Sequence, residues 1–225
     1  INFLGFPSWG SDRVLPNLIE ARKLLDPGTK INVSIGVNTK RRDVDQMKTD
    51  LTEMTELFYP HVDLLEVCFS CPNVKGLCEF QKQEEQIIDV IGAVTTKRDE
   101  LTKKLGKRVT VLYKIPPDSS DEAIDRSIRI KRHTGMDGFV ATNTSSERPG
   151  TLSSRKQKYP GGLSGQALEP IATATVWNLY ERSEGELIVG AGGVNNGRTA
   201  ARKIMAGACA VVSQTAIPFE GLDFD

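Results

Sequence analysis

VDLLEVCFSCPN, residues 62–73, combines the two features that decide the fold. Val62 to Phe69 is a short and almost continuously apolar run, as expected of a strand that is buried on both faces. Two side chains with reactive or hydrogen-bonding groups, Cys71 and Asn73, follow this run directly. In α/β barrels the loops after the strands build the active site. The stretch therefore predicts a strand of a parallel sheet whose carboxyl end carries the chemistry.

Five further runs share this apolar character, and longer stretches with helical spacing of apolar residues separate them. The predicted strands are Ile31–Val37, Val62–Phe69, Val109–Ile115, Gly138–Thr142, Leu187–Ala191 and Ala210–Ser213. Alternation of buried strands with amphipathic helices is typical of a parallel sheet covered by helices. We expect one domain over residues 1–225, and no internal repeat is visible.

A closed (β/α)8 TIM barrel is the architecture that best fits these runs, but six strands do not close it. About two strands are therefore expected upstream of Ile1, in keeping with the usual barrel length of ~250 residues. The open side would expose sheet edges and core. We expect a homodimer or a larger protein assembly to cover it.

Composition excludes several classes of function. The chain has 29 Lys and Arg and 29 Asp and Glu, so no strongly basic surface is available for nucleic acid. None of its apolar runs reaches the roughly 20 residues that span a bilayer. The four cysteines are too few for a disulfide scaffold, which favours a reducing compartment, mitochondrial or cytoplasmic. A small-molecule substrate remains the expected partner.

Glycine-rich loops follow the later strands. GGLSG spans residues 161–165, GAGGV spans residues 190–194, and Thr215 follows the last predicted strand. Loops of small residues at strand ends present backbone N–H groups that bind phosphate, and barrels place such sites after their last strands. Simple turn geometry is the competing interpretation, because glycine is permissive. The pattern favours a phosphorylated cofactor such as flavin mononucleotide (FMN).

Lys114 and the pair of Cys68 and Cys71 are two further features in or next to predicted strands. Lys114 lies within a predicted buried strand, where an unpaired ammonium is costly, so we favour a ligand contact for it. Cys68 and Cys71 form a C-x-x-C pair, which is compatible with half of a zinc site or with a redox pair. No second C-x-x-C or paired histidine follows, so no metal site is expected.

Several motifs, in order and at matching spacing, resemble those of dihydroorotate dehydrogenases: SCPNVKGL, KIPPD, ATNTSSERPG, GGLSGQALEPIATATVWNLY and GAGGVNNGRTA. The opening residues NFLGF resemble the family loop that meets the substrate carboxylate. The resemblance runs from Ile1 to about Gly221. It implies an FMN-dependent oxidation of dihydroorotate to orotate in pyrimidine biosynthesis, with a quinone or a fumarate-type electron acceptor.

The resemblance also implies site residues. Cys71 occupies the position of the catalytic base. Positions matching substrate contacts are Asn2, Gly5, Phe6, Asn73, Asn143 and Thr144. Positions matching cofactor contacts are Lys114, Ser164, Gly165, Gly192, Gly193 and Thr215.

The chain departs from the family at three positions and mixes two branches. Cys68 and Ser34 replace expected asparagines, and Gln214 replaces a frequent tyrosine. The cysteine of SCPN is typical of the soluble branch, whereas TNTSSERPG resembles the membrane-associated, quinone-using branch. These departures leave open a second hypothesis, in which a descendant of the family serves as a structural subunit of a larger assembly, for example a mitochondrial one.

Overall fold

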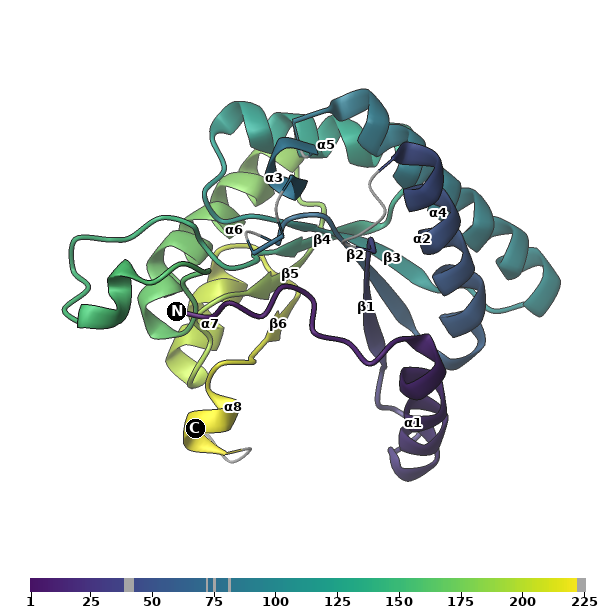
Figure 1. Ribbon diagram of the computed structural model, residues 1–225, viewed down its shortest axis with the longest axis horizontal. Helices are drawn as coiled ribbons and strands as arrows, with labels where there is room; N and C mark the ends of the chain where they lie inside the picture. The colour runs from purple at the N-terminus through teal and green to yellow at the C-terminus, as the bar shows by residue number, and fades with distance from the viewer. Residues whose placement is uncertain (39–42, 72, 75, 81, 222–225) are drawn as a thin grey trace.

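The computed structural model describes residues 1–38, 43–71, 73–74, 76–80 and 82–221. Its centre is a curved sheet of six strands that follow one another in chain order (Figure 1). The strands are β1 (Asn32–Gly36), β2 (Leu64–Cys68), β3 (Thr110–Ile115), β4 (Gly138–Ala141), β5 (Leu187–Ala191) and β6 (Ala210–Val212). Every neighbouring pair is parallel, so all carboxyl ends lie at one rim.

All six predicted strands are confirmed, with boundaries that agree within two residues. The sheet is curled and covered by helices, which confirms the expected α/β barrel class. β1 and β6 are its two edges, and among the described residues they do not pair with each other. The described sheet therefore has six of the eight strands of a closed (β/α)8 barrel.

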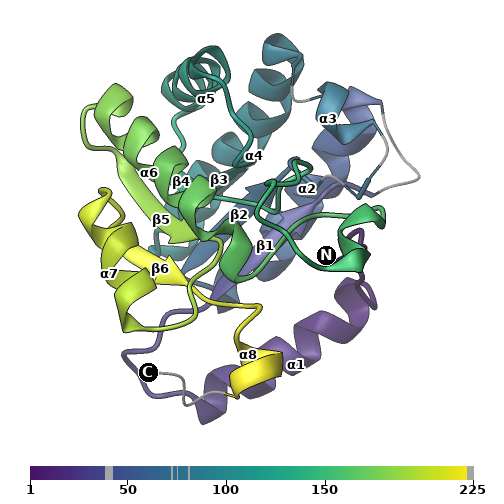
Figure 2. The ribbon, with the colours of Figure 1, turned by 90° about the vertical axis from the view of Figure 1, so that its left-hand side faces the viewer.

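Helices between the strands lie around the convex face of the sheet, while α1 precedes β1 and α8 follows β6 (Figure 2). They are α1 (Ser11–Leu24), α2 (Val44–Phe58), α3 (Leu77–Phe80), α4 (Glu84–Leu105), α5 (Asp121–Thr134), α6 (Glu169–Ser183), α7 (Gly197–Met205) and α8 (Ile217–Glu220), with 3₁₀ turns η1 (Tyr59–His61), η2 (Arg155–Lys158) and η3 (Gln166–Leu168). Asp43 and Ser120 cap α2 and α5 by accepting backbone N–H groups of the first turn. Gly106 and Gly135 end α4 and α5 in the left-handed conformation that glycine adopts readily. None of the described helices is long and apolar enough to cross a bilayer.

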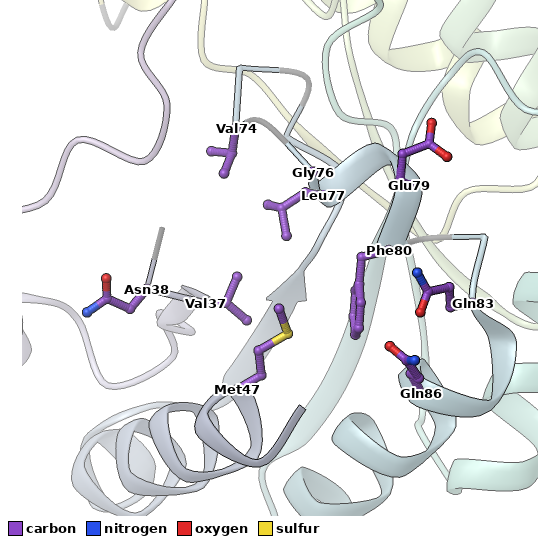
Figure 3. Close-up of a pocket in the computed structure, with 10 residues that line it drawn as sticks. All are labelled: Val37, Asn38, Met47, Val74, Gly76, Leu77, Glu79, Phe80, Gln83 and Gln86. Atoms are coloured by element: carbon purple, nitrogen blue, oxygen red, sulfur yellow. The ribbon is translucent and has the colours of Figure 1, made fainter. Parts of the chain in front are cut away.

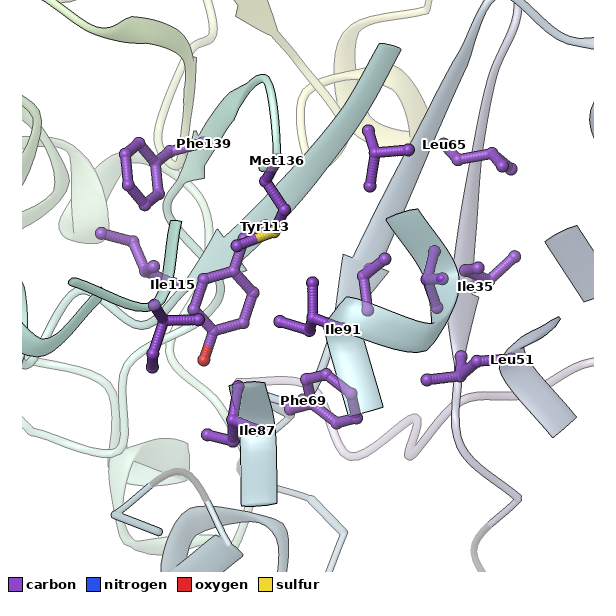
Figure 4. Packing of buried hydrophobic residues seen from close by; sticks show 14 of the residues in the cluster. Ile35, Leu51, Leu65, Phe69, Ile87, Ile91, Tyr113, Ile115, Met136 and Phe139 are labelled. Carbon is purple, nitrogen blue, oxygen red and sulfur yellow. The ribbon is translucent and has the colours of Figure 1, made fainter. Parts of the chain in front are cut away.

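The main core lies between the sheet and these helices. Outward-facing strand residues such as Ile35, Leu65 and Phe139 belong to one buried cluster with Leu51 of α2 and Ile91 of α4 (Figure 4). All five are at most 2% exposed. The core explains why the strands are apolar on this face and why the helices carry apolar stripes.

The opposite, concave face of the sheet changes character from one end to the other. A small apolar cluster joins Leu112, Val140 and Ala191, with Leu64 and Val189 packed against it. Toward the carboxyl rim the same face carries polar and ionisable side chains, which belong to the site described below. The concave face therefore has an apolar layer, and its polar side chains lie toward the carboxyl rim.

Helix α1 was not anticipated from the sequence. None of its residues is buried, and Pro16 lies inside it. Arg22 fastens it to the body of the protein by an ion pair with Asp63 at 2.5 Å and a hydrogen bond to Thr29 O at 2.8 Å. The ion pair and the backbone N–H of Ile31 hold the pKa of Asp63 below its usual value, despite the opposing effect of burial.

Lys203 of α7 provides a test of the packing between α6 and α7. It is fully buried, and Nζ donates to Thr173 Oγ1 at 2.6 Å and to Glu169 O at 3.2 Å. Burial lowers its pKa from 10.5 to about 8, and Glu169 opposes the shift. Between these two pH values the unfolded chain binds a proton that the folded chain does not, so folding becomes more favourable as the pH rises.

We expect the free energy of unfolding of the native protein, minus that of Lys203→Met, to increase as the pH rises above about 8. Urea unfolding of both proteins at several pH values measures this difference. Lys104→Met is the control, because Lys104 is exposed in α4. A Lys203→Met difference that stays flat with pH, as in the control, would contradict the buried amine.

Candidate functional site

The loops after β2, β3 and β4 meet at the carboxyl rim through a chain of hydrogen bonds. Asn143 Nδ2, just beyond β4, donates to Ser70 Oγ at 3.0 Å and lies 3.6 Å from Cys68 Sγ. Ser70 is buried, and its hydroxyl donates to the backbone oxygen of Lys114 at 3.0 Å. Thr144 N donates to Asn143 Oδ1 at 2.8 Å. Both ends of the Asn143 amide are thus held, and its orientation is fixed.

The N-terminal segment crosses this rim and adds a second asparagine pair. Asn2 forms an antiparallel bridge with Gly162, and its Nδ2 also donates to Gly162 O at 3.1 Å. Asn73 Nδ2 donates to Asn2 Oδ1 at 3.2 Å. A Cβ at Gly5 would lie 3.5 Å from Asn73 O, and the ring of Phe6 packs on β1. Both ribbon views show the N-terminus beside the loop that follows β4 (Figures 1 and 2).

Polar contacts hold the loop between β4 and α6 at the rim. Asp118, in the loop after β3, accepts from Ser145 Oγ at 2.5 Å and from Ser146 N at 2.8 Å. Arg148 donates to Gly161 O at 2.6 Å and to further backbone oxygens of the same loop. This polar framework needs no apolar core of its own, which explains the Ser- and Gly-rich composition.

Asn73 carries an orphaned acceptor in this cluster. Its Oδ1 atom is buried and has no hydrogen-bond partner among the described residues. A buried polar atom without a partner costs free energy, on the order of 1–3 kcal/mol. The atom is therefore suited to accept a hydrogen bond from a ligand N–H group.

The two cysteines of the rim differ in chemistry. Burial raises the pKa of Cys68 to about 11, although the charge of Lys114 opposes the shift. Cys68 is therefore a thiol near neutral pH and accepts an amide contact from Asn143. Cys71 is buried as well, at 8% exposure, between Ser70 and the loop that carries Asn73. Neither cysteine forms a disulfide.

Lys114 is paired, which the sequence alone did not show. Its Nζ lies 3.0 Å from Oε1 of Glu66 on the neighbouring strand β2. The same oxygen accepts from Ser34 Oγ of β1 at 2.8 Å. Glu66 is only 4% exposed. The one clue in the sequence was a glutamate inside an apolar strand run, a costly placement unless a partner is present.

The two glycine-rich loops and the segment that carries Thr215 come together on the other side of the rim. A Cβ at Gly165 would lie 3.1 Å from Thr215 Cγ2, and one at Gly192 would lie 3.3 Å from Thr142 Oγ1. A Cβ at Gly193 would lie 2.5 Å from Glu169 Cα, at the start of α6. Gly165, Gly192 and Gly193 all have positive φ angles, of 74°, 96° and 76°. Only glycine suits these positions.

These loops leave donors available. Across the described part of the chain, the backbone N–H groups of Gly165, Gly192, Gly193 and Thr215 make no hydrogen bond to another residue. Ser164 lies in the same loop as Gly165 and adds a hydroxyl. Loops of small residues with available N–H donors suit a phosphate group.

Comparison with known proteins identifies the family. The family model for dihydroorotate dehydrogenase matches residues 1–224, nearly the whole chain. The chain belongs to the dihydroorotate dehydrogenase family. It is 33% identical over 222 residues to dihydroorotate dehydrogenase (quinone) of Shewanella sediminis, which covers 98% of this chain and 64% of that protein. It is also 33% identical over 224 residues to the enzyme of the same name from Bradyrhizobium sp., covering 99% and 59%.

Solved structures of the dihydroorotate dehydrogenase family agree with this fold. Ligand-free DHODH of Eimeria tenella superposes with a TM-score of 0.88 at 31% identity, covering 98% of this chain and 65% of that one. DHODH of the same organism in complex with ferulenol gives 0.86 at 29% identity, covering 97% and 62%. The chain thus spans somewhat less than two thirds of the relatives it matches.

The residues that dihydroorotate dehydrogenase motifs single out form two neighbouring groups in the structure. The first contains Asn2, Gly5, Phe6, Cys71, Asn73, Lys114, Asn143 and Thr144, and the second contains Ser164, Gly165, Gly192, Gly193 and Thr215. Thr142 links the groups, since it precedes Asn143 and contacts the Gly192 turn. Sequence reasoning missed Glu66 and Ser70, which hold Lys114 and Asn143.

A separate pocket of about 170 Å³ lies outside both groups (Figure 3). Its floor is apolar, formed by side chains that include Val37, Met47 and Phe80. None of the predicted site residues lines it, although Val74, Gly76 and Leu77 of the SCPNVKGL motif do. It lies between the loop after β1, helix α3 and the start of α4, and it is not part of the candidate site.

Proposed function

We propose that this protein oxidises dihydroorotate to orotate in pyrimidine biosynthesis, with FMN as cofactor and a quinone as electron acceptor. The observation that carries the proposal is the cluster of Asn2, Asn73 and Asn143 amides beside Cys71, at the rim of a parallel barrel sheet. The quinone is proposed because the curated relatives described above bear it in their names. Residues 1–225 act in this proposal as one FMN-binding domain. Further polypeptide, from the same protein or from a partner, would cover the β1 and β6 edges.

The asparagine cluster suits a planar pyrimidine ring. Such a ring presents N–H donors and carbonyl acceptors along its edge, and side-chain amides complement both. Asn73 Oδ1 is the buried acceptor that lacks a partner among the described residues, so a ring N–H would satisfy it. Asn143 is held at both ends of its amide and cannot rotate to suit a different ligand without losing these bonds. The protein residues thus orient the substrate before reaction.

The glycine turns suit the phosphate of FMN. The unpaired N–H groups of Gly165, Gly192, Gly193 and Thr215 would hold the phosphate, and the Ser164 hydroxyl would add a donor. Lys114, on the other side of the rim, would contact the isoalloxazine ring. FMN, when bound, supplies the acceptor for the hydride that leaves C6 of dihydroorotate.

Cys71 would take the proton from C5 of dihydroorotate as the general base. Cys68 does not compete for this role, because burial keeps its pKa at about 11 and its thiol protonated. The buried position of Cys71 keeps bulk water from the proton transfer. The amide cluster holds the substrate next to the base, so that the proton has a short path.

We expect the full-length native protein to purify with FMN and its flavin absorbance to bleach when dihydroorotate is added without oxygen. Adding a soluble quinone should restore the absorbance. Anaerobic stopped-flow absorbance measures both steps. A flavin-loaded protein that dihydroorotate does not bleach would contradict the substrate. A protein without affinity for FMN would contradict the cofactor and support the structural-subunit hypothesis.

A further inference from the structure

Glu66 is a buried carboxylate to which neither the motifs nor the proposed reaction gives a role. It lies on the concave face of β2, opposite Leu112 of β3 in the sheet register, directly above the apolar layer. Its Oε1 atom receives Lys114 Nζ at 3.0 Å and Ser34 Oγ at 2.8 Å. Among the described residues, Lys114–Glu66 is the only ion pair with both members on strands.

Stability alone does not account for this pair. Removing two charges from water is costly, and buried ion pairs are often no more stable than apolar residues of similar size. The side chains of Glu66 and Lys114 are 6% and 21% exposed, so both are largely removed from water. The layer beneath shows that apolar side chains fill this interior well. The pair therefore serves something other than packing.

The geometry points to a charge effect. Lys114 Nζ has three donor positions, and Glu66 occupies one of them. The backbone oxygen of Lys114 accepts a hydrogen bond from Ser70, the residue that also holds Asn143, so Lys114 borders the asparagine cluster. Glu66 thus holds the ammonium at the rim and balances its charge.

We propose that Glu66 is a positioning residue for Lys114 and that the pair sets the electrostatic potential at the flavin ring. The inference rests on the proposed binding of FMN. With Glu66 ionised, the pair is neutral overall, and the site attracts added electrons less than a lone ammonium would. Interactions between charges a few ångströms apart are strong where water is largely excluded.

Glu66→Gln tests this directly, because glutamine keeps the shape and an acceptor oxygen but removes the charge. We expect the midpoint potential of bound FMN to become more positive. At a fixed poise the ratio of reduced to oxidised flavin should rise by about tenfold or more, since the ammonium is then unbalanced. Redox titration of the full-length protein against a reference dye measures the shift, independently of turnover.

Glu186→Gln is the matched control. Glu186 pairs with Lys131 at 2.6 Å, and their side chains are 25% and 17% exposed, but the pair lies at the amino end of β5. Removing the charge of Glu186 should change the melting temperature and leave the midpoint potential of the flavin unaltered. Equal potentials for native protein and Glu66→Gln would overturn the inference and leave Glu66 a structural residue.

A double-mutant cycle separates action through Lys114 from a direct effect. In a Lys114→Met background the Glu66→Gln shift should vanish, because no ammonium is left to balance. A shift that persists there would overturn the proposal. Loss of FMN binding in Glu66→Gln would also overturn it, since an unbalanced cation cannot weaken the binding of an anionic cofactor. Absence of FMN from the native protein would instead refute the proposed function itself.

Discussion

Replacing Cys71 by alanine is expected to slow the reduction of bound flavin by dihydroorotate by ~10²–10⁴-fold, the usual cost of losing a general base. FMN should stay bound, because Cys71 lies on the asparagine side of the rim and not among the glycine turns. The rate for the native protein should rise with pH as the thiol ionises, since only the thiolate accepts a proton. Single-turnover stopped-flow at several pH values measures both effects.

Two variants sharpen this test. Cys71→Ser should keep part of the activity, with its pH profile moved to higher pH, because a hydroxyl ionises less readily than a thiol. Cys209→Ala is the control, since Cys209 is exposed and lies before β6, at the amino end of the sheet. It should react at the native rate. A Cys71→Ala protein that reduces flavin as fast as this control would remove Cys71 from the reaction.

Gly193→Asp is expected to abolish the retention of FMN. A Cβ at this position would lie 2.5 Å from both Cα and Cβ of Glu169, and the φ angle of 76° disfavours any side chain. The added carboxylate would also repel the phosphate from the same turn. We expect the FMN dissociation constant to increase by more than ~100-fold, which corresponds to about 3 kcal/mol. Flavin content after gel filtration and fluorescence titration of the apoprotein provide the measurement.

The control for this variant is Gly28→Asp, which carries the same change in charge. No atom lies within 4 Å of a Cβ at Gly28, and its turn precedes β1, away from the rim. Its FMN content should match that of the native protein. Gly193→Ala separates the steric clash from charge repulsion, because it adds the Cβ alone. If Gly193→Asp bound FMN as Gly28→Asp does, the glycine turns would not be the phosphate site.

The sheet could be predicted from the sequence because strands buried on both faces are continuous runs of apolar residues. Val109–Ile115 and Leu187–Ala191 are nearly all apolar, so a strand that is buried on both faces is the structure expected for them. Helix α1 shows a weaker pattern, since none of its residues is fully buried and Pro16 lies inside it. Val14, Leu15 and Leu18 are only partly buried against the core, and the ion pair between Arg22 and Asp63 joins distant residues, which a local pattern does not contain.

The site divides in the same way. Motifs placed Asn73, Asn143 and the glycine turns at strand ends, where the parallel sheet brings them together. The pairing of Lys114 with Glu66 depends on the register between β2 and β3, and that register is fixed by packing of the whole sheet. For the same reason the sequence predicted a ligand contact for Lys114 and did not predict its ion pair with Glu66. The bridge between Asn2 and Gly162 spans 160 positions and was equally out of reach.

The order of the strands has a consequence for how the protein folds during translation. Each strand pairs with the one synthesised just before it, so every βα unit can dock on an edge that already exists. The sheet can thus grow in the direction of translation with short loops to close. The bridge from Asn2 to Gly162 cannot form until the loop after β4 has emerged. The first four strands can therefore assemble before Asn2, which pairs with Asn73, is joined to the loop after β4.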